Sequence, residues 1–211
     1  MKNLEIYIHI PFCVRKCEYC DFLSFPADDD AKLRYVKGLM AEMIFYGPLM
    51  KNYQVSSVYI GGGTPSSIDE QWIAALMEGV FDCFNVMPDA EISIECNPGT
   101  LSREKLLAYR DAGINRLSIG LQSANNDELK QLGRIHTFEQ FVTNYEVARN
   151  VGFKNINVDL MYGLPGQSAS QYMATVNKII RLHPDHISAY SLIVEKGTPF
   201  YEKYKFDMVR Q

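Results

Sequence analysis

The segment Cys13-Val14-Arg15-Lys16-Cys17-Glu18-Tyr19-Cys20 places three thiols on one short loop, directly after the apolar stretch Ile6-Tyr7-Ile8-His9-Ile10. The spacing C-x3-C-x2-C lets all three sulfurs reach a single metal centre without long-range folding. Soft thiolates bind zinc, copper(I) or iron–sulfur clusters. A four-ligand zinc site usually adds a second pair of Cys or His, and no second pair stands at such spacing here. Three ligands for a cluster that takes four leave one iron open to a substrate or cofactor.

With an aromatic residue before its last cysteine, this loop resembles the signature of the radical S-adenosylmethionine (radical SAM) superfamily. His9-Ile10-Pro11-Phe12-Cys13 and Gly61-Gly62-Gly63-Thr64-Pro65-Ser66 are similar to one branch of it. That branch holds the oxygen-independent coproporphyrinogen III dehydrogenase and the haem chaperones of the HemW type. The similarity runs from Tyr7 to about Phe200, nearly the whole chain. A structural zinc loop, or a binding module without SAM chemistry, is the alternative interpretation.

Composition and charge narrow the class of protein. The 211 residues are 47% hydrophobic and 22% charged, which is typical of one globular α/β domain. A formal charge of −4 shows no basic excess, so nucleic acid is not an expected partner. No stretch approaches the ~18 apolar residues of a membrane span. The first five residues lack the apolar core of a signal peptide, and crowded thiols need a reducing compartment, so we expect a cytoplasmic protein.

Strand and helix patterns alternate along the chain. Strands are predicted at Ile6–Ile10, Val55–Ile60, Glu91–Glu95, Arg116–Gly120, Asn155–Met161 and Ile187–Ile193. Helices are predicted at Lys32–Tyr46, Asp69–Phe84, Ser102–Ala112, near Asp127–Leu132, at Phe138–Val151 and at Ser170–Arg181. Six strand–helix units in tandem favour a parallel sheet with helices outside it. Eight units close a barrel of about 250 residues, so six predict an α/β fold of the three-quarter (β/α)6 type, a partial TIM barrel. The radical SAM resemblance implies the same fold.

The glycine-rich segment Gly61–Ser66 follows the second predicted strand. Three consecutive glycines let the backbone approach a ligand closely. The segment is not a Rossmann fingerprint, because Ser66 stands where the last glycine belongs and Asp82 falls in a helix. We therefore interpret it as a ligand-binding loop.

Polar side chains recur near the carboxyl ends of three predicted strands. Glu95, Gln122 and Asp159 occupy these positions. Ligand sites of barrels and open α/β sheets form at this end of the strands. Each residue could instead cap its own loop, but together with the cysteine and glycine loops they predict one shared site.

The resemblance also implies a role for each of these residues. Cys13, Cys17 and Cys20 would hold a [4Fe-4S] cluster whose fourth iron binds the amino and carboxylate groups of S-adenosyl-L-methionine (SAM). The resemblance implies that Gly62, Gly63 and Thr64 contact the amino end of SAM. It places Tyr19 near the adenine and Tyr7 near the cluster. The positions that match contacts to the carboxylate or the ribose of SAM are Glu95, Gln122, Arg134 and Asp159. A guanidinium suits a carboxylate, although Arg134 could also be a surface ion-pair partner.

Two further groups of residues have structural interpretations. Cys83 and Cys96 lie inside apolar segments and are interpreted as small buried core residues. Asp28-Asp29-Asp30 is interpreted as a solvated helix start before Ala31.

One position separates the two functions known in this branch. The dehydrogenase carries an additional Cys two places after its last cluster Cys, whereas Phe22 stands there in this chain. This departure, and the short lead before Tyr7, are similar to HemW. We therefore expect a haem chaperone that transfers haem to acceptor proteins. The alternatives are an oxygen-independent coproporphyrinogen III oxidase and another radical SAM enzyme of unknown substrate.

The domain organisation follows from the same resemblance. Residues 1–211 are expected to be one radical SAM core domain of a longer protein, because the haem motif of HemW lies in a C-terminal domain that this sequence lacks. Haem is therefore expected to bind through that missing region. The expected partners are SAM, haem or a porphyrin, a haem-acceptor protein and a reductant such as flavodoxin or ferredoxin.

Overall fold

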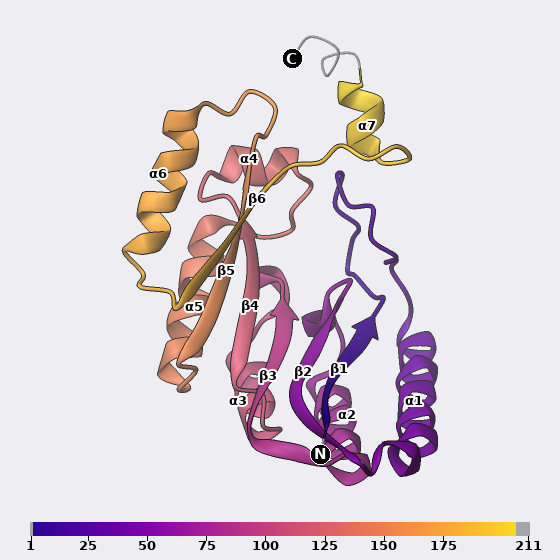
Figure 1. Ribbon diagram of the computed structural model, residues 1–211. Helices are drawn as coiled ribbons and strands as arrows, with labels where there is room; N and C mark the ends of the chain where they lie inside the picture. Colours follow the sequence, from indigo (N-terminus) through magenta and orange to yellow (C-terminus); the bar gives the residue numbers. More distant parts are fainter. Residues whose placement is uncertain (1, 206–211) are drawn as a thin grey trace.

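A single six-stranded parallel sheet forms the centre of the computed structural model, which describes residues 2–205. The strands are β1 (Lys2–Ile10), β2 (Tyr53–Gly62), β3 (Val86–Cys96), β4 (Arg116–Gln122), β5 (Asn155–Tyr162) and β6 (His186–Ser191). Their order in the sheet is their order in the sequence, with β1 and β6 at the two edges. The prediction of a (β/α)6 partial barrel with parallel strands is confirmed (Figure 1).

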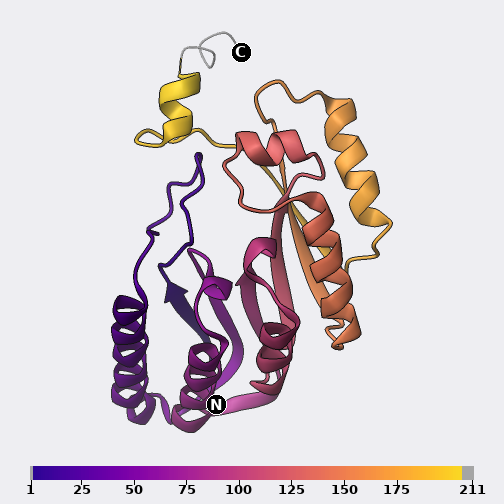
Figure 2. The same cartoon turned by 180° about the vertical axis from the view of Figure 1, so that it is seen from behind.

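Helices follow the strands and cover one face of the sheet. They are α1 (Asp29–Tyr46), α2 (Glu70–Cys83), α3 (Arg103–Asp111), α4 (Asn126–Gln131), α5 (Phe138–Asn150), α6 (Ala169–Ile180) and α7 (Pro199–Tyr204), with short 3-10 turns at Gly47–Met50, Pro65–Ser67 and Pro98–Thr100. Helices α2, α3 and α5 lie behind the strands in Figure 1 and in front of them in Figure 2. None of the helices described has the length and apolar character needed to cross a membrane.

The two faces of the sheet differ in polarity, because successive side chains of a strand point to opposite sides. Toward the helices the strands bury aliphatic residues such as Ile60, Ile94 and Leu117. The strand registers place polar residues on the other, inner face: Tyr7, Tyr59, Ser93, Glu95, Arg116, Ser118, Asn157, Asp159 and Ser188. Closed barrels fill their interior with branched apolar side chains. This open barrel differs: its apolar core lies between the outer face of the sheet and the helices, and the inner face of the sheet is polar.

Several element boundaries differ from the sequence prediction. Strand β1 begins at Lys2 and β3 at Val86, earlier than predicted. The added part of β1 contains the exposed polar residues Lys2 and Asn3, and the added part of β3 contains Pro88 and Asp89, which are both exposed. Helix α7 was not predicted. It is only six residues long, and its start is defined by Thr198, whose Oγ1 accepts a hydrogen bond from the Tyr201 N–H.

Two structural interpretations of single residues can also be compared with the structure. The Asp28 side chain caps α1 by accepting a hydrogen bond of 2.7 Å from the Ala31 N–H, which confirms the helix start. Cys96 is buried, as predicted. Cys83 is only half-buried, so that part of the prediction was wrong: it is the last residue of α2 and contacts the core from its margin.

Candidate functional site

A cavity opens at the carboxyl ends of the strands, where the loops after β1, β2, β3 and β4 meet side chains of β5 and β6. All the predicted site residues except Tyr7 line it: Cys13, Cys17, Tyr19, Cys20, Gly62, Gly63, Thr64, Glu95, Gln122, Arg134 and Asp159. Segments as far apart in the sequence as Cys13 and Asp159 therefore share one cavity, as expected for parallel strands whose carboxyl ends lie at one edge.

The three cysteines of the loop are free thiols on one wall of this cavity. Two of their sulfurs accept hydrogen bonds, Cys13 Sγ from Thr64 Oγ1 at 3.4 Å and Cys17 Sγ from Arg134 Nη1 at 3.3 Å. Burial raises the pKa of the Cys20 thiol. Within residues 2–205 no three His, Cys, Asp or Glu side chains are grouped closely enough to hold a single metal ion. The donors that face the sulfurs suit thiolate ligands, because they stabilise negative charge on sulfur.

The cysteine loop is docked on the segment that follows α4. The Glu18 N–H donates to the Leu132 carbonyl at 3.2 Å, and Arg15 Nη2 donates to the Gly133 carbonyl at 2.7 Å. Gly133 has a φ of 74°, and a Cβ there would lie 2.8 Å from Glu18 Cγ. Only glycine permits both this backbone conformation and this close approach.

A second contact ties the cysteine loop to the end of the described chain. The Phe200 N–H donates to the Glu18 carbonyl at 2.9 Å. The Phe200 ring is 1% exposed and belongs to a small apolar cluster, against which Tyr19 packs. Figures 1 and 2 both place α7 directly above the tip of the loop that follows β1. Helix α7 therefore holds the cysteine loop against the sheet.

Replacing Phe200 with alanine is expected to loosen this contact, because removing a buried phenyl ring typically costs about 3–5 kcal/mol. The thiols of the metal-free loop should then react several-fold faster with an alkylating reagent, as measured by mass spectrometry of the loop peptide. Phe45→Ala is the control, since Phe45 is 67% exposed on α1. An unchanged alkylation rate in Phe200→Ala would show that α7 does not restrain the loop.

The glycine loop lines one part of the cavity. Its N–H groups are already used: that of Gly62 donates to Glu95 Oε2 at 3.0 Å, that of Gly63 to the Ile10 carbonyl at 2.8 Å, and that of Thr64 to the Phe12 carbonyl at 2.8 Å. Carbonyl oxygens accept hydrogen bonds and do not donate them. The loop is therefore suited to a cationic donor such as an ammonium group.

Two carboxylates line the cavity without an ion-pair partner among residues 2–205. Glu95 accepts hydrogen bonds from the Tyr59 hydroxyl at 2.8 Å and from the Gly62 N–H. Asp159 accepts from Asn157 Nδ2 at 2.7 Å. Burial raises the pKa of both carboxyl groups, although these hydrogen bonds oppose the shift. Both side chains keep further acceptor capacity for polar groups of a ligand.

The side chains of Arg134 and Gln122 are neighbours, and both lie close to Gly120 at the end of β4. Arg134 Nη2 donates to the Gly120 carbonyl at 2.7 Å, whereas its buried Nε has no hydrogen-bond partner in the described part of the chain. A Cβ on Gly120 would approach both Gln122 Nε2 and Arg134 Nη2. Gln122 has a φ of 75°, and its Oε1 accepts a hydrogen bond of 2.7 Å from the Tyr190 hydroxyl. The Gln122 side-chain amide and the Arg134 guanidinium are thus neighbouring donors at the cavity, and such a pair suits an anionic group of a ligand.

Tyr7 is the one predicted site residue that lies outside the cavity. Its side chain is 58% exposed, and its hydroxyl is 3.0 Å from His9 Nδ1. The cavity also contains residues that sequence reasoning missed, among them Ser118 and Tyr190. Their signal was the polar residue at every second position of β4 and β6, which marks the inner face of the sheet.

Comparison with known proteins agrees with this geometry. Residues 7–179 match the radical SAM superfamily. The chain is 40% identical over 196 residues to the heme chaperone HemW of Bacillus subtilis and 39% identical over 203 residues to that of Escherichia coli. These alignments cover 92% and 93% of this chain and 52% of each relative, so the chain spans about half the length of the curated relatives it matches.

Solved structures show the same fold. Coproporphyrinogen III oxidase (HemN) from Escherichia coli, a radical SAM enzyme, superposes with a TM-score of 0.84 at 27% identity, covering 99% of this chain and 52% of that one. Methylornithine synthase (PylB) superposes with a TM-score of 0.64 at 15% identity, covering 94% of this chain and 56% of that one. The cysteine loop, the partial barrel and the match over residues 7–179 together place the chain in the radical SAM superfamily.

Proposed function

We propose that this chain is the cluster- and SAM-binding core of a haem chaperone of the HemW type. The observation that carries the proposal is Phe22. It stands two places after Cys20, the position at which the coproporphyrinogen dehydrogenase has a further cysteine. The curated relatives support it, since those with about 40% identity are named heme chaperones. A coproporphyrinogen III oxidase is the second candidate, supported by the structural similarity at 27% identity.

The cavity residues fit the groups that the superfamily implies. Cys13, Cys17 and Cys20 hold the [4Fe-4S] cluster, with the hydrogen bonds from Thr64 and Arg134 supporting their sulfurs. When bound, the cluster supplies the electron that cleaves SAM to a carbon radical in this superfamily. The orphaned Nε of buried Arg134 is the structural sign that a group belongs in this cavity.

The remaining roles follow from charge and hydrogen-bonding capacity. The loop containing Gly62, Gly63 and Thr64 would receive the amino group of SAM through free carbonyl oxygens. Tyr19 would lie near the adenine. The family resemblance also implies a place near the cluster for Tyr7, whose side chain lies outside the cavity in this structure. The polar side chains Glu95, Gln122, Arg134 and Asp159 bind the carboxylate and the ribose hydroxyls.

The wider setting is part of the same proposal. Residues 1–211 act as one core domain, haem binds through a further region of the protein, and the protein works in the cytoplasm. A small electron-transfer protein such as flavodoxin or ferredoxin reduces the cluster, and an acceptor protein receives the haem.

The proposal is tested by anaerobic reconstitution with iron and sulfide, followed by electron paramagnetic resonance of the reduced cluster. SAM is expected to change the spectrum, because it binds the open iron. The full-length protein, which contains the further region, is then reconstituted and incubated with coproporphyrinogen III, SAM and a reductant, and its haem binding is measured by absorbance. A haem chaperone leaves coproporphyrinogen unchanged. Its oxidative decarboxylation would instead identify the chain as the oxidase, and a cluster indifferent to SAM would contradict both functions.

A further inference from the structure

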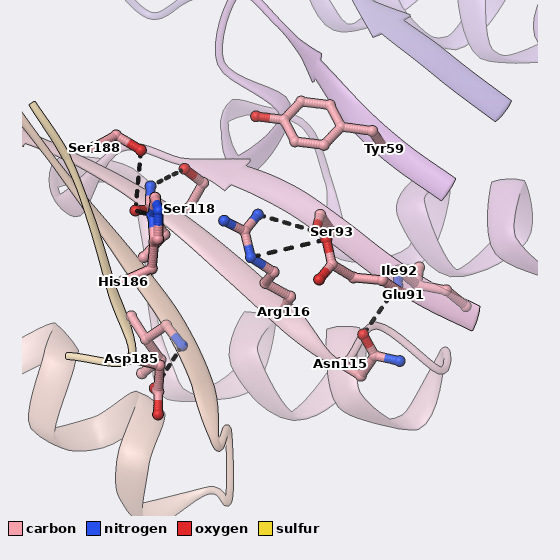
Figure 3. Close-up of polar contacts among 12 residues, drawn as sticks. Tyr59, Glu91, Ile92, Ser93, Asn115, Arg116, Ser118, Asp185, His186 and Ser188 are labelled. Carbon is pink, nitrogen blue, oxygen red and sulfur yellow. Dashed lines mark hydrogen bonds and ion pairs between the residues drawn. The ribbon is translucent and has the colours of Figure 1, made fainter. Parts of the chain in front are cut away.

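The polar inner face below the cavity contains a hydrogen-bonded network centred on Asn157, which is 1% exposed on β5. Ser118, His186 and Ser188, labelled in Figure 3, converge on its amide group from β4 and β6. Asn157 Nδ2 donates to Asp159 Oδ1 at 2.7 Å and to Ser118 Oγ at 2.8 Å. Asn157 Oδ1 accepts from Ser188 Oγ at 3.1 Å and lies 2.6 Å from His186 Nδ1. All of its amide hydrogen-bonding groups are thus engaged.

The hydrogen-bond chemistry fixes the orientation of this amide. An ionised Asp159 can only accept, so the end of Asn157 that faces it must be the NH2 group. The opposite end is then the carbonyl oxygen, to which His186 Nδ1 and the Ser188 hydroxyl must donate. A flipped amide would place its oxygen against the Asp159 carboxylate. Three neighbouring strands therefore hold Asn157 in one orientation.

Asn157 in turn determines how Asp159 is held. No Lys, Arg or His forms an ion pair with Asp159 within residues 2–205, so its carboxylate depends on neutral donors. Oδ1 accepts the 2.7 Å bond from Asn157, and the Ser118 hydroxyl lies 3.4 Å from Oδ1 and 3.3 Å from Oδ2. The Ser188 hydroxyl is a further hydrogen-bond partner of this carboxyl group. Each carboxylate oxygen can accept about two hydrogen bonds. Because Asp159 lines the cavity, its oxygens can accept hydroxyl groups from a ligand there.

We propose that Asn157 is a positioning residue for ligand binding: by anchoring Asp159 Oδ1 it directs the carboxylate to accept the hydroxyls of a vicinal diol, the ribose of SAM. This inference rests on the proposed function, because it takes SAM as the ligand. It adds a residue that does not line the cavity and that acts through Asp159.

The test is a double-mutant cycle read by the dissociation constant for SAM on the reconstituted protein. Asn157→Leu keeps the approximate size of the side chain and removes its hydrogen bonds. It is expected to weaken SAM binding about tenfold, the effect of losing one hydrogen bond to a charged group. In the Asp159→Ala background the same substitution should have no further effect. Asn155→Leu, two residues earlier on the same strand, is the matched control and should change the affinity less than about twofold.

A second ligand and a second variant sharpen the test. Methionine lacks the ribose, so its affinity should be the same in wild type and Asn157→Leu. His186→Phe removes one donor to Asn157 Oδ1 from the edge strand β6, and His186 is not among the hydrogen-bond partners of Asp159 within residues 2–205. It should weaken SAM binding about threefold if the network positions Asp159.

The possible outcomes separate this inference from the proposed function. If wild type and Asn157→Leu bind SAM equally well, Asn157 is not a positioning residue. The same conclusion follows if Asn157→Leu weakens SAM binding by the same factor in the Asp159→Ala background as in wild type. An equal loss of methionine binding would show general disturbance of the sheet, and would also overturn the inference. If the wild-type cluster does not respond to SAM, the proposed function fails and this inference fails with it.

Discussion

Replacing Cys17 with alanine is expected to reduce the iron content after anaerobic reconstitution from about four atoms per chain to less than about one. The cluster has only three protein ligands, all on one loop, so losing one leaves two thiolates and two open irons. Cys17 also accepts the hydrogen bond from Arg134 Nη1, which ties the cluster site to the loop after α4. Iron and acid-labile sulfide per chain, together with the visible absorbance, measure the effect.

Cys83→Ala is the matched control for this experiment. Cys83 is half-buried at the end of α2 and does not line the cavity, so its variant should keep the full iron and sulfide content. Cys96 lines the cavity and is the thiol that could replace a lost ligand. If Cys17→Ala retained its cluster and Cys17→Ala/Cys96→Ala lost it, Cys96 would have replaced Cys17 in the single variant. A cluster retained in both variants would show that the assignment of Cys17 as a ligand is wrong.

Replacing Gly63 with alanine is expected to abolish SAM binding and to lower cluster occupancy several-fold. A Cβ on Gly63 would lie 2.8 Å from the Phe12 carbonyl oxygen and 3.1 Å from Cys13 Sγ. The Phe12 contact is with backbone, which cannot rotate away as a flexible side chain can. The cysteine loop must therefore move away from the glycine loop, at a cost of about 1–3 kcal/mol for an overpacked site. Iron content and the response of the paramagnetic signal to SAM measure the result.

Gly38→Ala provides the control for the glycine substitution. Gly38 lies within α1, and a Cβ there would meet no atom within 4 Å. Alanine should stabilise the helix by up to about 1 kcal/mol and leave cluster and SAM binding unchanged. If Gly63→Ala bound SAM as tightly as Gly38→Ala, the two loops would not need their close approach.

The accuracy with which the sequence predicted the bounds of helices and strands differed between parts of the chain. Long periodic segments such as α5 (Phe138–Asn150) and β5 (Asn155–Tyr162) were predicted to within one or two residues. Helix α7 was missed because six residues are too few to show helical periodicity. The beginning of β1 was missed because the hydrophobic pattern fades where the strand becomes exposed.

For the site, residue types at strand ends predicted Glu95, Gln122 and Asp159 beside the cysteine and glycine loops, whereas Tyr19 and Arg134 followed only from the family resemblance. The strand ends were informative because in a parallel sheet every carboxyl end lies at the same edge, so position along each strand translates into a place in the molecule. Ser118 and Tyr190 were missed, since their role depends on which strand is the neighbour. Tyr7 is exposed outside the cavity, although its place in the sequence is next to the cysteine loop.

The sequence by itself determined the order and type of the elements, the spacing of the three thiols and the glycine loop, because these depend on local periodicity and on residue chemistry. Only the tertiary structure decided that α7 holds the cysteine loop, that Arg134 faces Cys17, and that Asn157 orients Asp159. The physical reason is that hydrogen bonds are short and directional. Whether a donor and an acceptor meet depends on the register and twist of strands that the chain brings together from distant positions.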